Sequence, residues 1–163
     1  MNYESLLDEA HQDGLVVKEK PLKYNNGRIK GIKIAIRNDI DTTTEKSCIL
    51  AEELGHYYTT TGNILDQSVV MNRKQEHRAR LWAYDKMIGL NGLISAAKAG
   101  CQSQYEIAEY LEITEEFLSE ALAVYRQKYG LGKLVDNYWI CFTPTLQVYE
   151  YSLIDKSSCR DVN

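Results

Sequence analysis

The sequence has few of the residues that mark specialised architectures. Its 163 residues include only two prolines and three histidines, and its uninterrupted apolar runs are short. A membrane-spanning helix needs about 20 consecutive apolar residues, so we expect neither such a helix nor a secretory signal segment. The composition, 44% hydrophobic and 26% charged, is typical of a globular chain with one core. We therefore expect one domain in the cytoplasm.

Closely spaced cysteines and excess positive charge are also missing. Cys48, Cys101, Cys141 and Cys159 form no Cys-x-x-Cys pair, which excludes a zinc ribbon and a thioredoxin-type redox motif. The formal net charge of -4 gives no overall attraction to nucleic acid or to anionic membranes. A partner of either kind would need a local basic patch.

Two segments near the N-terminus have clear periodicity. Residues 3–11 space their apolar side chains as an amphipathic helix does, and Gly14 is the expected stop. Residues 31–37 alternate with period two, which predicts a half-buried strand that ends at the turn-forming pair Asn38 and Asp39.

A longer helix is predicted to begin at Thr43 or Thr44 and to end near Gly62. The threonines can cap its first turn, and Glu45 lies three residues after Thr42, as in a capping box. Its core-facing stripe has three- and four-residue spacing and consists of Cys48, Ala51, Gly55 and Tyr58, with Leu54 beside them.

This helix carries Glu52, Glu53 and His56. Glu52 and His56 are four residues apart, so they lie one turn apart on one face and can both reach a single metal ion. Glu53 points about 100° away and is the candidate general base for the attacking water. The layout is that of the zincin motif His-Glu-x-x-His, with Glu52 in place of the first histidine. A carboxylate is an acceptable ligand of Zn²⁺ and also suits Mn²⁺ or Fe²⁺.

A simpler interpretation of the same pattern needs no metal. Glu-Glu-x-x-His occurs by chance in helices, and Glu52 with a protonated His56 would then form an ordinary i,i+4 ion pair.

The third metal ligand is expected from the next helix, predicted to begin near Asn72. That helix has a buried stripe formed by Ala79, Trp82, Ala83 and Met87. Extended backward, the stripe reaches Glu76, which is the first candidate, although Arg80 at i+4 offers it an alternative partner. His77 is the second candidate and Asp66, in the preceding loop, the third.

The stretch CILAEELGHYYTTTGNILD, residues 48–66, resembles the active-site helix of the ImmA/IrrE family of metallopeptidases. The isoleucine-rich strand before it lies where that family places a substrate-flanking strand, and the resemblance covers residues 1–130. It implies an α+β, mainly helical, zincin-like fold with a small sheet, a Zn²⁺ cofactor and metal-dependent endopeptidase activity. The family's third ligand typically opens a Glu-Ala-Asn-x-Phe-Ala motif, and aligning that motif puts Arg78, two residues after Glu76, at the ligand position.

The resemblance also implies a substrate and a mechanism. The family acts in the regulation of phages and mobile elements, which makes a helix-turn-helix repressor the expected protein substrate. Glu53 would pass the proton of the attacking water to the leaving amine, and the substrate would extend beside residues 32–36 by β-augmentation. Tyr57 or Tyr58 is close enough in sequence to help stabilise the oxyanion.

Residues 104–128 have the outline of a helix-turn-helix, with Thr114 as the N-cap of the second helix. A recognition helix needs lysine or arginine, but the segment from Gln102 to Glu120 has six glutamates and neither cation. We therefore expect these helices to complete the core of a domain spanning residues 1–130 and not to bind nucleic acid. Residues 131–163 are predicted to add a strand pair, within 137–151, and a tail.

Two other functions remain open from the sequence. If the site binds no metal because Glu52 replaces the ligand histidine, the chain is an inactive family member that binds a repressor without cutting it. Alternatively, the chain is a regulatory DNA-binding protein that uses the 104–128 helices together with the basic residues of the second predicted helix, which are Arg73, Lys74, Arg78 and Arg80.

Overall fold

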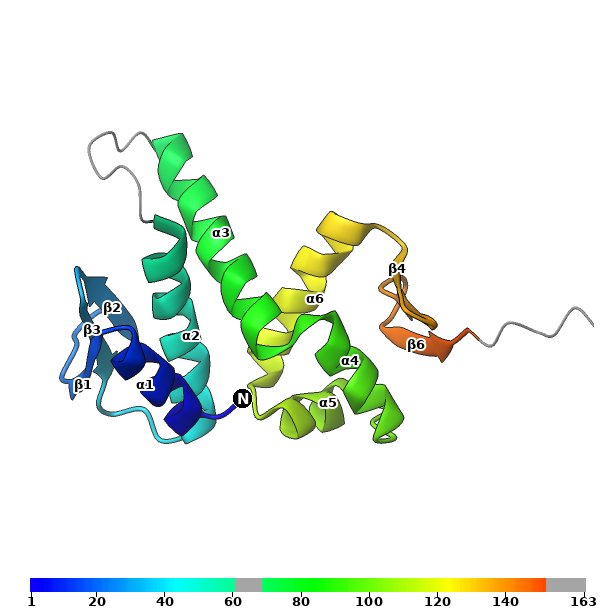
Figure 1. Cartoon of the computed structure of the whole chain (residues 1–163), viewed down its shortest axis with the longest axis horizontal. Coiled ribbons are helices and arrows are strands. Elements are labelled where there is room, and N and C mark those ends of the chain that lie inside the picture. Colours follow the sequence, from blue (N-terminus) through cyan, green and yellow to red (C-terminus); the bar gives the residue numbers. More distant parts are fainter. Residues whose placement is uncertain (61–68, 152–163) are drawn as a thin grey trace, which may run out of the picture.

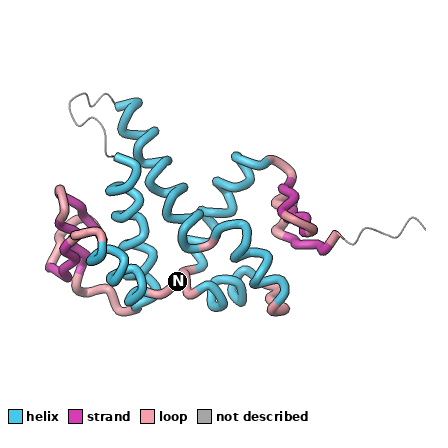
Figure 2. The backbone as a smooth tube through the Cα atoms, viewed as in Figure 1, coloured by secondary structure: helices cyan, strands magenta, loops and turns pink. Residues whose placement is uncertain are grey.

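The computed structural model describes residues 1–60 and 69–151, and side chains within 1–60 and 73–151. Over these ranges the fold is α+β, as predicted: helices form the middle of the molecule, and a small sheet lies at each end (Figures 1 and 2). The helices are α1 Tyr3–Gln12, α2 Thr43–Thr60, α3 Val69–Met87, α4 Gly89–Lys98, α5 Gln104–Leu111 and α6 Glu115–Tyr129. The strands are β1 Val16–Lys20, β2 Gly27–Lys30, β3 Lys33–Arg37, β4 Gly132–Val135, β5 Tyr138–Cys141 and β6 Gln147–Glu150. None of the described helices combines the length and the apolarity needed to cross a bilayer.

The first sheet has the strand order β1-β3-β2, in which β3 is parallel to β1 and antiparallel to β2. The predicted strand within residues 31–37 is confirmed as β3, and its alternation buries Ile34 and Ile36 in the core. Ile32 precedes the strand and is 54% exposed. The strands β1 and β2 were not predicted.

Helix α2 lies against α3 at very short range because of Gly55. A Cβ atom at this position would be 2.3 Å from the backbone oxygen of Ala79, far inside van der Waals contact. Ala79 and Ala83, both completely buried, supply the facing surface of α3. The core-facing stripes predicted on the two helices supply Gly55, Ala79 and Ala83 to this interface, and α2 begins at Thr43 as predicted.

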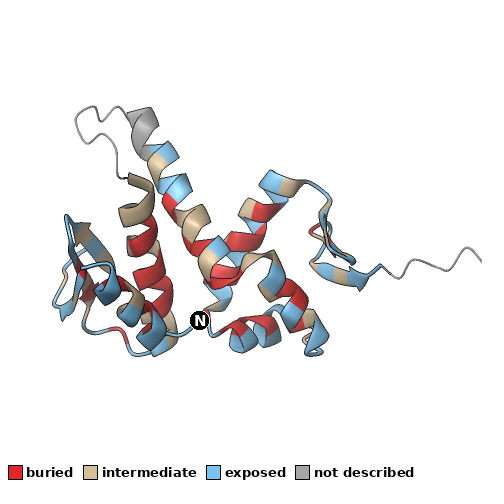
Figure 3. Ribbon diagram, in the orientation of Figure 1, coloured by how far each residue is buried: buried red, intermediate tan, exposed pale blue. Residues whose placement is uncertain are grey.

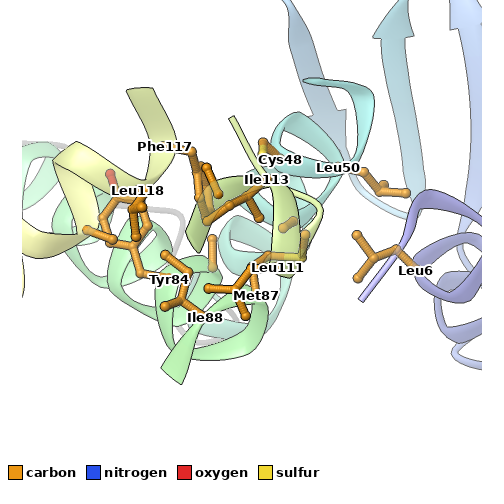
Figure 4. Close-up of a cluster of buried hydrophobic side chains, with 14 of the residues drawn as sticks. Leu6, Cys48, Leu50, Tyr84, Met87, Ile88, Leu111, Ile113, Phe117 and Leu118 are labelled. Carbon is orange, nitrogen blue, oxygen red and sulfur yellow. The ribbon is translucent and has the colours of Figure 1, made fainter. Parts of the chain in front are cut away.

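One hydrophobic cluster runs through the molecule (Figure 4). Leu6 of α1 and Leu50 of α2 are fully buried beneath the first sheet, and Tyr84 of α3 stacks edge-on against Phe117 of α6. Figure 3 shows that buried residues concentrate on the helices, whereas the strands present many exposed ones.

The helices α5 and α6 are joined by a three-residue turn, with Glu112 in the left-handed region. Thr114 caps α6 by accepting a hydrogen bond from the Phe117 backbone N–H, as predicted. Their inward faces complete the core through Ile107, Leu111, Phe117, Leu118 and Leu122.

The second sheet is an antiparallel meander of β4, β5 and β6. The predicted strand pair corresponds to β5 and β6, and β4 adds a strand that the sequence pattern did not predict. The expected tail, residues 152–163, lies outside the described residues.

Candidate active site

The close contact at Gly55 brings the candidate residues of α2 near α3. Glu52 and Glu53 lie in the middle of α2 and are half-buried, and His56 lies one turn after Glu52. Because Gly55 lets α2 approach the backbone of α3, the adjacent His56 comes within reach of side chains on the preceding turn of α3.

The α3 residue that His56 meets is Glu76, the first candidate for a third ligand. His56 Nε2 lies 3.3 Å from Glu76 Oε2. The other carboxylate oxygen, Glu76 Oε1, accepts a hydrogen bond of 2.8 Å from Arg80 Nε, so the i,i+4 pair expected from the sequence is present as well. Glu76 is therefore shared between a histidine of α2 and an arginine of its own helix.

Arg80 extends this polar network to α6, which the sequence did not indicate. Its Nη1 lies 3.5 Å from Glu120 Oε2, and the Tyr84 hydroxyl donates a 2.8 Å hydrogen bond to the same oxygen. Nothing in the local pattern of α6 points to this contact, because Glu120 is 40 residues from Arg80.

Glu76, Arg80 and Glu120 border a cleft of about 570 Å³, which is enclosed by α2, α3, α6 and the segment that leads into β2. Its charged lining consists of one cation, Arg80, and six glutamates, which are Glu45, Glu52, Glu53, Glu76, Glu116 and Glu120. Burial, the charge of Glu52 and then that of Glu76 raise the pKa of Glu53 to about 7. Burial also raises the pKa of Glu52, against the opposing effect of Arg80. A carboxyl with a pKa near neutrality suits proton transfer, as a general base requires.

Glu53 faces the free edge of β2. A Cβ atom on Gly27 would be 2.6 Å from Glu53 Oε1 and 2.7 Å from Ile49 Cγ2, so a larger residue here would displace these two side chains. The Ile29 backbone N–H lies near the Glu53 carboxylate and partly offsets the rise of its pKa.

The expectation that substrate pairs with residues 32–36 is wrong. That segment contains β3, the central strand, whose two edges are already paired with β1 and β2. An added strand needs unpaired backbone groups, and near Glu53 these belong to β2.

The site fits a metal ion in part. Two ligand atoms bound to one tetrahedral Zn²⁺ lie about 3.3 Å apart, given metal–ligand distances near 2.0–2.1 Å. The 3.3 Å separation of His56 Nε2 and Glu76 Oε2 matches this value, and imidazole and carboxylate are suitable donors. However, the described residues include no group of three His, Cys, Asp or Glu side chains arranged to hold a metal. Glu52 therefore lies near the pair without completing a three-ligand set.

The remaining candidates lie elsewhere. His77 is exposed and lines a neighbouring groove with Arg73 and Tyr84, and Arg78 is also exposed. Asp66 lies outside the described residues. Tyr58 does not face the cleft, because its hydroxyl donates to Asp13 and its ring packs against Trp82.

Comparison of the chain with protein-family models, with curated proteins and with solved structures gives no match.

Proposed function

We propose that this protein is a metal-dependent endopeptidase whose active site is the cleft between β2, α2 and α3. The observation that carries the proposal is the contact between His56 and Glu76, 3.3 Å apart, next to a glutamate whose pKa is raised to about 7. The resemblance of residues 48–66 to the ImmA/IrrE active-site helix supports the same activity.

In this proposal His56 and Glu76 hold the metal, and Glu52 is the third ligand after a change in its side-chain conformation. Zn²⁺, or Mn²⁺ or Fe²⁺ in its place, would supply Lewis-acid polarisation of the scissile carbonyl. Glu53 takes the proton of the attacking water and transfers it to the leaving amine. The Ile29 N–H keeps the Glu53 carboxylate oriented, and Arg80 orients Glu76.

The expected substrate is a protein segment with positive charge. It would pair with the free edge of β2 and lie along a cleft whose lining has six glutamates and one arginine. A helix-turn-helix repressor offers such a segment, because its recognition helix is rich in lysine and arginine. This charge complementarity supports the repressor substrate suggested by the family resemblance.

Metal content tests the ligand set. The purified protein is loaded with Zn²⁺, dialysed and analysed for metal, alongside His56→Ala and Glu76→Ala. The expected result is close to one Zn²⁺ per chain in the parent and little in either variant. His11→Ala is the matched control, because His11 is exposed at the end of α1, and it should keep the metal. A parent that cannot be loaded would rule out the metallopeptidase.

Peptidase activity is tested with a library of peptides. The Zn²⁺-loaded protein should cleave members with basic residues near the scissile bond, and the products identify the cleaved position. The proposed substrate class is wrong if the loaded protein cleaves acidic and basic peptides equally.

The second candidate function is repressor binding without cleavage. It is favoured by Arg80, which occupies one oxygen of Glu76, and by the lack of a three-residue metal group in the described part of the chain. A protein that binds a basic repressor segment, holds no metal and leaves the segment intact would identify this function.

A further inference from the structure

The outer face of the first sheet is strongly basic. Side chains at alternating positions of β1, β2 and β3 point away from the core, and every charged member lining the hollow on this face is a cation. The cations are Lys18, Lys20, Arg28, Lys30 and Lys33, and all five are exposed. We call them the basic sheet face. They are five of only 19 lysines and arginines in a chain with net charge -4.

The register concentrates these charges on both sides of a small residue. One transverse row contains Lys18, Ala35 and Arg28, and the next contains Val16, Lys33 and Lys30. The single methyl group of Ala35 leaves a hollow of about 390 Å³ between the long side chains. Positively charged side chains therefore surround a hollow whose base is Ala35.

The cations are not neutralised by the protein itself. None of the five belongs to a salt bridge found among the described residues. Glu19 of β1 binds Lys46 of α2 instead, on the opposite face of the sheet. Lys30 and Lys33 are direct cross-strand partners, an arrangement of like charges that disfavours the sheet. An anionic partner would remove this repulsion.

The spacing and composition of the face favour a nucleic-acid backbone. Alternate residues of a strand are about 6.7 Å apart, close to the separation of consecutive phosphates along one strand of DNA. The face has no aromatic side chain, so it offers no stacking platform for unpaired bases. Binding to a membrane surface is also disfavoured, because Val16 is the only large apolar side chain among the exposed residues that line the hollow.

We propose that the basic sheet face binds the phosphate backbone of duplex DNA without reading its sequence. This binding site is separate from the cleft, because the inward face of the sheet carries Ile34 and Ile36 and packs on the helices between. The proposal goes beyond the peptidase function and does not depend on it, since no residue of the cleft contributes a contact. It also differs from DNA binding by α5 and α6, whose exposed surface is acidic.

The test measures binding of the full-length chain to a fluorescently labelled duplex by anisotropy, over a series of salt concentrations. The patch variant combines Lys18→Gln, Lys30→Gln and Lys33→Gln. The control variant combines Lys74→Gln, Lys98→Gln and Lys133→Gln, three exposed lysines outside the basic sheet face. Both variants lose three positive charges, so they differ only in where the charge is removed. Circular dichroism and urea unfolding verify that each variant is folded.

The patch variant is expected to bind at least about 10-fold more weakly at 50 mM salt, and the control variant within about 3-fold of the parent. The slope of log K against log salt should fall by about 3 × 0.9 in the patch variant, and duplexes of unrelated sequence should bind alike.

The proposal is overturned if the parent does not bind duplex at 50 mM salt, or if both variants weaken binding equally. It is also overturned if the patch variant loses binding to polyglutamate or to phosphatidylserine vesicles while duplex binding is unchanged. A selective loss of polyglutamate binding would identify an acidic protein as the ligand. A selective loss of vesicle binding would identify a membrane surface.

Discussion

Glutamates gather in two regions of this protein, the cleft and the surface of α5, and their environments are opposite. In the cleft, burial and neighbouring carboxylates raise the pKa of Glu53 to about 7. On α5, Glu106 is exposed, and its pKa is lowered by hydrogen bonds from the backbone N–H groups of Gln102 and Ser103. One group has a protonation state that can change near neutrality, whereas the other is a solvated helix cap. The same residue type therefore has a pKa near neutrality in one place and caps a helix in the other.

The largest difference between the two regions should appear in catalysis. Replacing Glu53 by Gln keeps its size but removes the proposed base, so peptide cleavage should fall by about 10³-fold. The measurement is the cleavage rate of a peptide selected from the library, together with metal content, which should remain near that of the parent. Glu115→Gln, an exposed glutamate at the start of α6, is the matched control and should retain full activity. Equal activity of the parent and Glu53→Gln would remove Glu53 from the mechanism.

The interface between α2 and α3, which lies beside the cleft, should also be far more sensitive to added volume than α4 is. Gly55→Ala places a methyl group 2.3 Å from the Ala79 backbone oxygen, so α2 and α3 must separate. We expect a loss of about 3 kcal/mol in the free energy of unfolding, measured by urea denaturation. Gly92→Ala is the control, because its nearest neighbour is a Leu111 methyl at 3.3 Å, which can move. A loss of the same size in both variants would show that the close approach of the helices is not special.

Replacing Glu52 by histidine should change zinc affinity, an effect smaller than the two above. Glu52→His restores the His-Glu-x-x-His pattern, and imidazole is a softer ligand that suits Zn²⁺ better than a carboxylate does. Zinc affinity should rise by about 10-fold in a competition titration with a chromophoric chelator. Glu115→His supplies a histidine outside the cleft and should leave the affinity unchanged. An unchanged affinity in Glu52→His would place residue 52 outside the ligand set.

The smallest effect is expected on α5 and depends on pH. Because the pKa of Glu106 is lowered in the folded state, its carboxylate stabilises the protein above the unfolded-state pKa, about 4.3. This contribution is lost as the pH falls through the lowered pKa of the folded state. Glu106→Gln should therefore be less stable than the parent at pH 7, and the difference should disappear in strong acid. Urea unfolding at a series of pH values measures it, and a constant difference would contradict the assignment.

The helices could be predicted because their signals are local. Caps and three- or four-residue spacing define α1, α2 and α6 within one or two turns of sequence. The strands β1 and β2 have no such signal, because β1 reads Val-Val-Lys-Glu-Lys and β2 contains a glycine. Their pairing with β3 is decided by tertiary contacts, which a single sequence does not display.

The site residues likewise divide into those that local sequence patterns predicted and those that depend on tertiary contacts. Extending the buried stripe of α3 backward pointed to Glu76, and the structure places this residue beside His56. The alignment of the family motif pointed instead to Arg78, which is exposed and away from the cleft. Glu120 could not be found, because its contact with Arg80 joins two helices 40 residues apart. The basic sheet face was equally hidden, since its cations come from three strands of which only one was predicted.

Gly55 links the rigidity of the molecule to the geometry of its cleft. The hydrogen atom at this position sets the distance between two helix axes, and the same distance sets how far His56 lies from Glu76. Any substitution on either helix that shifts their separation by a fraction of an ångström will alter the spacing of these two side chains. Mutations selected for thermal resistance along this interface would thus change the distance between His56 and Glu76, even if they contact neither residue.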